Sequence, residues 1–217
     1  MSKKTSLTIE QAFTKLNDDE KSTELAKGFT LSVVYDLIKQ DDRQKASKFV
    51  HTRFYHRYLM PSKKVDPSYN SGFAQMAACC LMIEAMESFR HGWKTTYKLK
   101  DEHGKEVYGG KIFGDFFKHY SEFADFADLG FEFYDSIRCG ILHQAETKNG
   151  WRIERDKKYP LLDKSNRIIH STEFRYGMEI CLRKYCKELV DDDSVWNLFK
   201  TKMGYIIENC HKKKMKS

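Results

Sequence analysis

Apolar positions follow a helical period along most of the chain and alternate only over short stretches. A first short helix is predicted after Thr8, which can form a capping box with Gln11. Two longer helices are predicted over GFTLSVVYDLIKQ and, capped by Asp41 or Asp42, over RQKASKFVHTRFYHRYL, with Pro61 ending the second. The pattern predicts a mostly α fold.

The middle of the chain contains its most apolar helical segment. After a predicted polar loop from Met60 to Gly72, residues Phe73 to Trp93 are apolar on nearly every side, which is typical of a central, enclosed helix. Polar residues interrupt it along one stripe, formed by Glu84, Glu87, Ser88 and His91. We expect this stripe to face water, because two carboxylates are costly to bury unless a cation forms an ion pair with them.

The second half of the chain mixes aromatic helices with short alternating segments. Residues between Lys94 and Lys111 predict a hairpin excursion or a loop, and Ile112 to Gly130 predicts a helix. The alternating segments WRIER and RIIH predict a small β-hairpin insertion, followed by helices from Ser171 or Thr172 to about Val190 and from near Ser194. The predicted aromatic core residues are Phe116, Phe117, Tyr120 and Phe123.

The composition indicates a globular protein. Hydrophobic residues make up 41% of the 217 residues, with 15 Phe and 12 Tyr, so we expect one domain over residues 1–217. No segment approaches the roughly 18 apolar residues of a membrane span. The polar start also lacks the apolar run of a signal peptide. We therefore expect a cytoplasmic location and no membrane partner.

Cysteine spacing argues against a metal site. The six cysteines include no CxxC pair, and we expect buried free thiols, no metal and no cofactor. The chain also has no Gly-rich phosphate loop, no GxSxG and no HExxH motif, which removes many familiar enzyme classes.

Positive charge permits a nucleic-acid partner without indicating one. The net charge is +7, but part of it lies in the start MSKK and in the basic C-terminal tail 211–217. Arg53, His56 and Arg57 form a basic stripe at helical spacings of three and four. This stripe can follow a phosphate backbone or be a solvated helix face.

An arginine and a histidine interrupt an otherwise apolar helix between Phe131 and Thr147. The helical period places Arg138 toward apolar neighbours such as Ile137 and Ile141. A guanidinium cannot lose its charge, so it must find a carboxylate such as Glu84 or Glu87, a second subunit or an anionic ligand.

The string YDSIRCGILHQAET, in which four residues separate Arg138 from His143, resembles the HEPN superfamily, the helical domains named for higher eukaryotes and prokaryotes nucleotide-binding. Members carry an arginine, four to six residues and a histidine, and Cys139 stands where many of them have a polar residue. The resemblance covers about residues 73–190 and implies a helical bundle with metal-independent endoribonuclease activity. It also implies a defence, toxin or stress role, with RNA or a nucleotide as ligand and an antitoxin among the candidate partners.

Histidine and arginine suit that chemistry. A histidine can take the proton of a ribose 2′-OH near neutral pH, and a forked guanidinium can hold the charge that builds on the phosphate. His143 is therefore the candidate base or acid, and Arg138 is the candidate phosphate clamp. Residues that can contribute less directly to substrate binding are Gln144, Glu146, Glu84, Arg53, His56 and Arg57.

Helix geometry sets a condition on this pair. Side chains five residues apart on a straight α-helix diverge by about 140°. Either the helix is distorted near Gly140, or two copies of the motif meet across a homodimer, where Gly140 lets two backbones approach. We expect the homodimer. The alternative to an enzyme is a non-catalytic nucleotide-binding, RNA-binding or dimerisation module, in which Arg138 has only a structural role and Gln144 and Glu146 are exposed helix-end residues.

Overall fold

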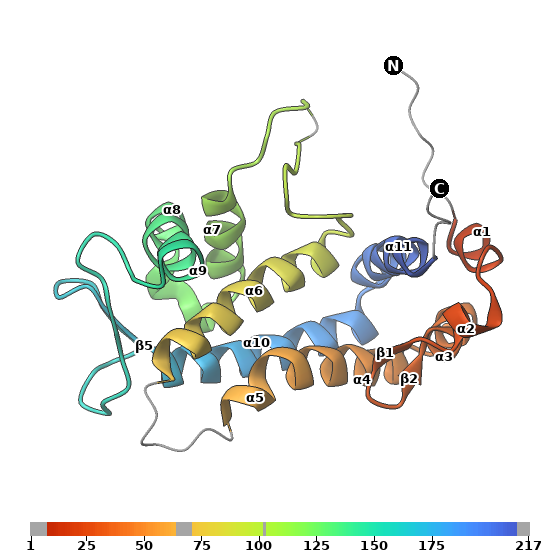
Figure 1. The fold of residues 1–217 in the computed structure, drawn as a ribbon, viewed down its shortest axis with the longest axis horizontal. Coiled ribbons are helices and arrows are strands. Elements are labelled where there is room, and N and C mark those ends of the chain that lie inside the picture. The colour runs from red at the N-terminus through yellow and green to blue at the C-terminus, as the bar shows by residue number, and fades with distance from the viewer. Residues whose placement is uncertain (1–7, 64–70, 102, 212–217) are drawn as a thin grey trace, which may run out of the picture. The chain divides into compact units, whose positions relative to one another are not determined.

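The computed structural model describes residues 8–63, 71–101 and 103–211, and these residues are mostly helical, as predicted (Figure 1). The basic tail beyond residue 211 and residues 64–70 of the predicted polar loop lie outside the described residues. The described chain forms two compact units, which we treat separately. The first comprises Met1–Arg53, Ser88–Lys94 and Tyr185–Ser217, and the second comprises Phe54–Glu87 and Thr95–Lys184. The single-domain expectation stays a prediction.

The first unit begins with short, well-capped elements. Thr8 and Gln11 form the predicted capping box at the start of the first helix. The helix predicted over GFTLSVVYDLIKQ starts later than expected, at Leu31, because Thr30 caps it and Phe29 and Thr30 form a strand. The elements are α1 (Ile9–Phe13), α2 (Asp18–Lys21), β1 (Glu24–Ala26), β2 (Phe29–Thr30), α3 (Leu31–Lys39), α4 (Arg43–Phe54) and α11 (Asp193–Cys210).

Pro61 does not end the helix that begins with α4. A π-helical segment, η1 (Tyr55–Leu59), and then α5 (Met60–Lys63) continue it. Pro61 follows directly on this wider turn, in which the Met60 N–H bonds five residues back to the Tyr55 carbonyl. The predicted stop at Pro61 is therefore wrong.

The central apolar helix is α6 (Gly72–Arg90), close to its predicted bounds. Its polar stripe does not face water as we expected: Glu87 is fully buried, and the Glu84 side chain is only 16% exposed. Leu81, one turn before Glu84 and two turns before Ser88, is instead 42% exposed. The expectation failed because Arg138 supplies Glu84 with the cation that makes burial tolerable.

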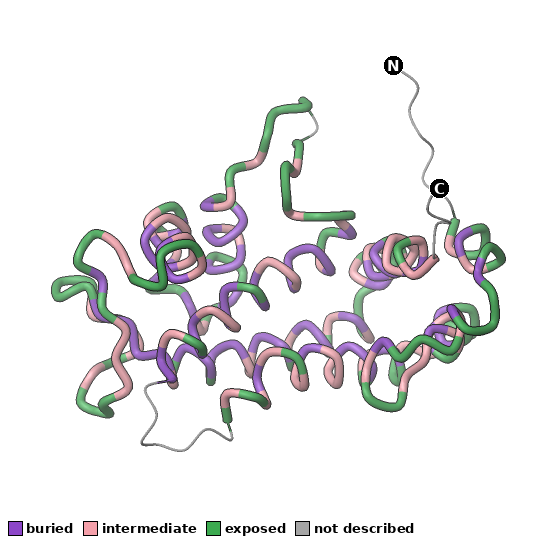
Figure 2. Tube along the Cα trace, in the orientation of Figure 1, coloured by how far each residue is buried: buried purple, intermediate pink, exposed green. Residues whose placement is uncertain are grey.

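The second unit is built around aromatic side chains. The segment Ile112 to Gly130 is not one helix, because the chain leaves α7 at Tyr120, which is extended. All four predicted aromatic core residues are buried, and Figure 2 shows buried positions along α7. The helical elements here are α7 (Gly109–His119), the 3₁₀ segment η2 (Ser121–Phe126), α8 (Gly130–Phe133) and the first part of α10 (Ser171–Asp191), which starts as predicted.

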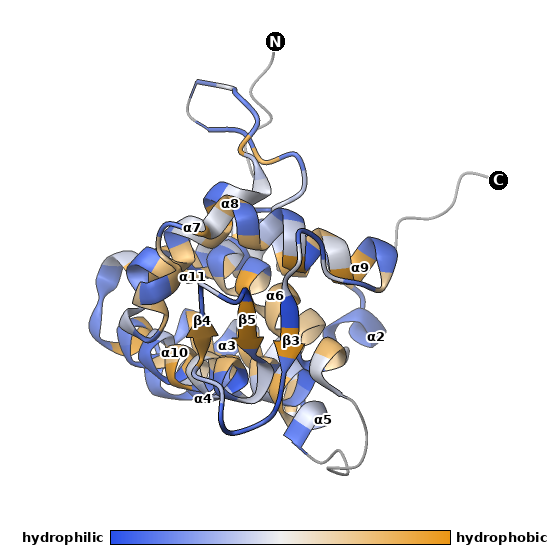
Figure 3. Cartoon of the chain, turned by 90° about the vertical axis from the view of Figure 1, so that its left-hand side faces the viewer, coloured by the Kyte–Doolittle hydropathy of each residue, from blue (hydrophilic) through white to orange (hydrophobic). Residues whose placement is uncertain are grey.

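A small sheet precedes α10. It contains β3 (Arg152–Glu154), β4 (Leu162–Asp163) and β5 (Ile168–His170), with β5 between the other two (Figure 3). β4 and β5 are antiparallel, which confirms a small β insertion. The segments WRIER and RIIH, however, pair in parallel, because β4 lies between them in the chain and takes the antiparallel edge of β5.

Glycines allow α7 and α8 to approach closely. A Cβ atom on Gly130 would lie 2.5 Å from the backbone of Gly114, whereas a Cβ atom on Gly114 would lie 3.8 Å from Gly130. The same helix contact therefore leaves room for a side-chain methyl group at Gly114 but not at Gly130.

We expect Gly130→Ala to lower the free energy of unfolding by roughly 2 to 3 kcal/mol, because the added methyl group overlaps backbone atoms that cannot move aside. Gly114→Ala is the matched control and should change stability by about 1 kcal/mol or less, since helix propensity favours alanine. Urea denaturation of both variants measures the difference. Equal effects would contradict this account of the contact.

A buried lysine lies in the first unit. Lys202 on α11 is 9% exposed, and its Nζ donates to the carbonyl oxygens of Trp93 at 2.9 Å and Lys94 at 3.3 Å. Burial lowers the pKa of Lys202 to about 8, with a smaller contribution from the positive charge of Arg53. The unfolded chain therefore binds more protons than the folded chain between the two pKa values.

Because the folded pKa of Lys202 lies below its unfolded value, its contribution to stability should rise as the pH increases from about 8 to 10.5. Over that range the difference in unfolding free energy between the wild type and Lys202→Met should change by on the order of 2 kcal/mol. Denaturation of both proteins at several pH values tests this. A difference that does not vary with pH would contradict it.

Candidate functional site

The Arg138 and His143 motif lies on a distorted helix of the second unit. After α8 the chain forms a π-helical segment, η3 (Tyr134–Cys139), and then α9 (Gly140–Gln144), which ends at Ala145 in the left-handed conformation with φ 56°. A π-helix bonds residue i to residue i+5, so the turn that contains Arg138 is wider than an α-helical turn, whereas His143 lies on the α-helical part that follows. The helix is therefore distorted next to Gly140, as one of the two alternatives required.

The two motif side chains meet within one chain. Arg138 Nη1 lies 3.3 Å from His143 Nε2. The arginine side chain is only 19% exposed, whereas His143 is exposed at the protein surface. The pair thus joins an anchored cation to an accessible imidazole.

Gly140 packs against its own chain. A Cβ atom there would lie 2.5 Å from the carbonyl oxygen of Glu146, in the turn that follows α9. This turn is fastened to η3, because the Lys148 N–H donates to the Ser136 carbonyl at 3.0 Å. We expected Gly140 to admit a second backbone across a dimer. That expectation is wrong, because the backbone of the turn after α9 already occupies the space beside Gly140. The homodimer itself stays a prediction.

Glu84 on α6 holds the guanidinium from the other side. Arg138 Nε donates to Glu84 Oε1 at 3.1 Å, and Nη2 donates to Oε2 at 3.3 Å. Burial alone would lower the pKa of Arg138, but the hydrogen bonds and charge of Glu84 raise it above its usual value. The predicted bridge between Arg138 and Glu84 is confirmed, and it fixes the plane of the guanidinium.

The contact between Arg138 and His143 defines the imidazole tautomer. A guanidinium has only donors, so His143 Nε2 must accept the hydrogen bond with its lone pair. A hydrogen bond at this contact therefore requires the tautomer that carries its proton on Nδ1. A neutral imidazole with a lone pair on Nε2 is the form that a general base requires.

Tyr134 completes the surroundings of the arginine. The Arg138 Cζ atom lies 5.5 Å from the centroid of the Tyr134 ring, which is a cation–π distance. Burial raises the pKa of the Tyr134 hydroxyl, with a further contribution from the Cys139 thiol. Sequence reasoning did not assign Tyr134 to the site, although its position four residues before Arg138 on a helix was a usable signal.

The remaining sequence candidates are placed differently. Gln144 and Glu146 are exposed at the helix end, and the Glu146 carboxylate accepts from the Thr147 N–H at 2.9 Å. Both fit the alternative of exposed helix-end residues.

The predicted basic stripe does not follow a regular α-helix. Arg53 belongs to the first unit, where its Nη1 donates to the Leu25 carbonyl at 2.6 Å. His56 and Arg57 belong to the second unit and lie on the π-helical segment η1, which breaks the spacing from which we predicted the stripe.

The described residues contain neither a cluster of metal ligands nor a membrane-spanning helix. Within residues 8–63, 71–101 and 103–211, no group of three or more His, Cys, Asp or Glu side chains is arranged to hold a metal ion. Over the same residues, no helix has the length and apolar character needed to cross a membrane.

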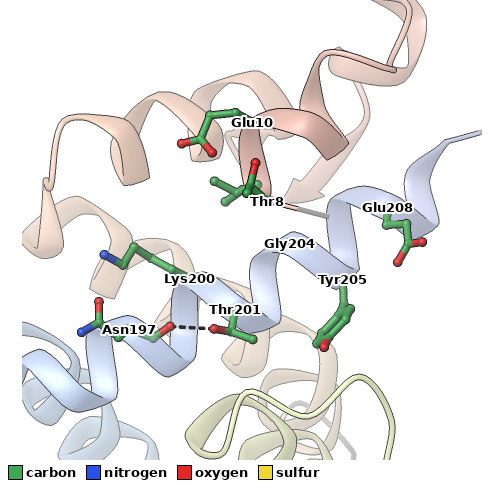
Figure 4. Close-up of a pocket in the computed structure, with 9 residues that line it drawn as sticks. Thr8, Glu10, Asn197, Lys200, Thr201, Gly204, Tyr205 and Glu208 are labelled. Atoms are coloured by element: carbon green, nitrogen blue, oxygen red, sulfur yellow. Dashed lines mark hydrogen bonds between the residues drawn. The ribbon is translucent and has the colours of Figure 1, made fainter. Parts of the chain in front are cut away.

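The first unit has a groove of its own, with a volume of about 460 Å³, between α1 and α11. Figure 4 shows Thr8 and Glu10 on one wall and Lys200 and Tyr205 on the other. The lining is mostly polar and contains none of the sequence-predicted site residues. The groove therefore gives no support to the motif chemistry.

Comparisons with protein-family models, with curated proteins and with solved structures found no significant match to this chain.

We expect Arg138→Ala to lower the free energy of unfolding by about 2 to 3 kcal/mol, because it leaves the Glu84 carboxylate without its cation in a mostly buried position. Glu84→Gln should suppress part of that loss, so the two substitutions should couple by at least about 1 kcal/mol in a double-mutant cycle. His143→Ala is the control and should cost less than about 0.5 kcal/mol. Additive effects of the two substitutions would show that the pair contributes little.

Proposed function

We propose that this protein is a metal-independent endoribonuclease of the HEPN type. The observation that carries the proposal is the 3.3 Å contact between Arg138 Nη1 and His143 Nε2 at an exposed position. An imidazole base and a fixed guanidinium are the two groups that cleavage of RNA through its own 2′-OH requires when no metal takes part.

The role of each residue follows from its surroundings. His143, which is exposed, accepts the proton of the ribose 2′-OH on Nε2 once the substrate displaces the Arg138 N–H. The 2′-oxygen then bonds to phosphorus as the bond from phosphorus to the 5′-oxygen breaks, and the leaving 5′-oxygen takes a proton from water. Arg138 keeps its position because Glu84 holds two of its nitrogens, and its remaining N–H groups are directed to the phosphate oxygens. Glu84 is then a positioning residue, which acts through the arginine.

Glu84 also supports the rival function. A carboxylate that already neutralises the guanidinium weakens its attraction for a phosphate, and this favours a module that binds RNA or a nucleotide without cleaving it, or a purely structural pair. Activity separates these readings. The defence, toxin or stress setting, an antitoxin partner and a homodimer belong to the proposal through the motif resemblance alone.

We expect the purified protein to cleave RNA in excess EDTA and to leave 2′,3′-cyclic phosphate ends, because the ribose 2′-OH is the nucleophile. His143→Ala should reduce the rate by about 10² to 10⁴-fold, the usual contribution of a general acid or base, while the melting temperature stays unchanged. Arg138→Lys keeps the charge and loses the fork, so it should recover more stability than activity relative to Arg138→Ala.

Cleavage rates and melting temperatures are measured on the same preparations. Cleavage that EDTA abolishes and Mg²⁺ or Mn²⁺ restores would reject the metal-independent mechanism. Full activity of His143→Ala, or the absence of cleavage of every RNA offered, would favour the binding module.

A further inference from the structure

Two aromatic rings lie exposed and stacked on each other in the second unit. Tyr108, which precedes α7, is 50% exposed, and Phe131 on α8 is 61% exposed. Their ring centroids are 5.5 Å apart, and the rings are nearly parallel at 11°. Apolar surface of this kind that is left open to solvent commonly marks a contact site for a ligand or partner.

Close packing against the start of α7 restricts the positions of these rings. A Cβ atom on Gly109 would lie 2.1 Å from the Tyr134 ring, and one on Gly110 would lie 2.7 Å from the Phe131 backbone. The two glycines that open α7 therefore allow the aromatic residues of the motif helix to pack directly against it. An exposed pair with fixed positions loses little conformational freedom on binding.

The aromatic pair is continuous with the candidate catalytic site. The Tyr108 ring lies 5.1 Å from the Tyr134 ring, edge to face, and the Tyr134 ring lies 5.5 Å from the Arg138 guanidinium. Tyr108 is thus at most about 11 Å from Arg138. This distance corresponds to about three nucleotides of a stacked strand that rises about 3.4 Å per nucleotide.

We propose that Tyr108 and Phe131 form a stacking platform for the unpaired bases of an RNA strand bound at this site. This inference rests on the proposed function and adds two base-contacting residues to it. Aromatic rings beside a cation suit a single strand, because bases stack on the rings while the cation holds the backbone. A duplex does not fit, since its bases already stack on one another. The platform should also tolerate many sequences, because every base has a π face.

Binding is tested in the full chain carrying His143→Ala, which prevents cleavage of the probe. The probe is a short fluorescent single-stranded oligoribonucleotide at fixed low salt, with the matching duplex as competitor. Replacing both rings, Tyr108→Leu with Phe131→Leu, should weaken binding at least about tenfold. Phe131→Tyr keeps a ring and should retain binding. Tyr97→Leu is the matched control, since Tyr97 is 73% exposed in the same unit and lies outside the platform.

Melting curves first establish that each variant is folded. If the double variant does not fold, Phe131→Tyr and the competition by the duplex still test the platform. Unchanged binding by the folded double variant would overturn the platform, as would a duplex that competes as well as the single strand. Loss of self-association without loss of RNA binding would assign the rings to contact with a second copy and overturn it too. Ring-dependent binding by a protein whose wild type cleaves nothing would reject the proposed function and support the platform alone.

Discussion

The two-point hydrogen bonding between Glu84 and Arg138 is the interaction on which the candidate site depends. It joins α6 to the motif helix, and it allows α6 to bury a carboxylate that would otherwise need water. With two nitrogens fixed on Glu84, the third is directed at His143. The pair thus serves packing and also holds the arginine in the position that the proposed function needs, so the structural and catalytic interpretations of Arg138 do not exclude each other.

Glycines set the other constraint on this unit. Gly130 lets α8 lie on α7, and Gly140 lets the motif helix fold its following turn back against itself. In both places backbone atoms occupy the space that a side chain would need, so the close approach is built into the chain. The site geometry is therefore determined largely by where side chains are missing.

Regular helical periodicity predicted most of the helices. The Thr8 capping box, the extent of α6 and the start of α10 at Ser171 all follow from signals local in sequence. Glu84 was one of the partners expected for Arg138, because a guanidinium among apolar residues demands a partner, but the contact of Arg138 with His143 within one chain was left as one of two alternatives.

Features that depend on distant contacts were not predictable. The polar stripe of α6 was expected to face water, since the residues near Glu84 in the sequence include no sign that Arg138 pairs with this carboxylate. The helix passing Pro61 and the parallel pairing of β3 with β5 depend on π-helical geometry and on sheet topology, which leave no local signature. Tyr134 escaped notice because an aromatic residue on a helix is usually core.

The π-helical turn at Tyr134–Cys139 also has a consequence for the direction of the whole motif. The wide turn ends at Cys139, and residues Gly140–Gln144 return to a regular α-helix. The widening therefore rotates this part of the helix relative to α8 before His143 is reached. An insertion or deletion between Tyr134 and Arg138 should consequently turn Arg138 and His143 together away from Glu84.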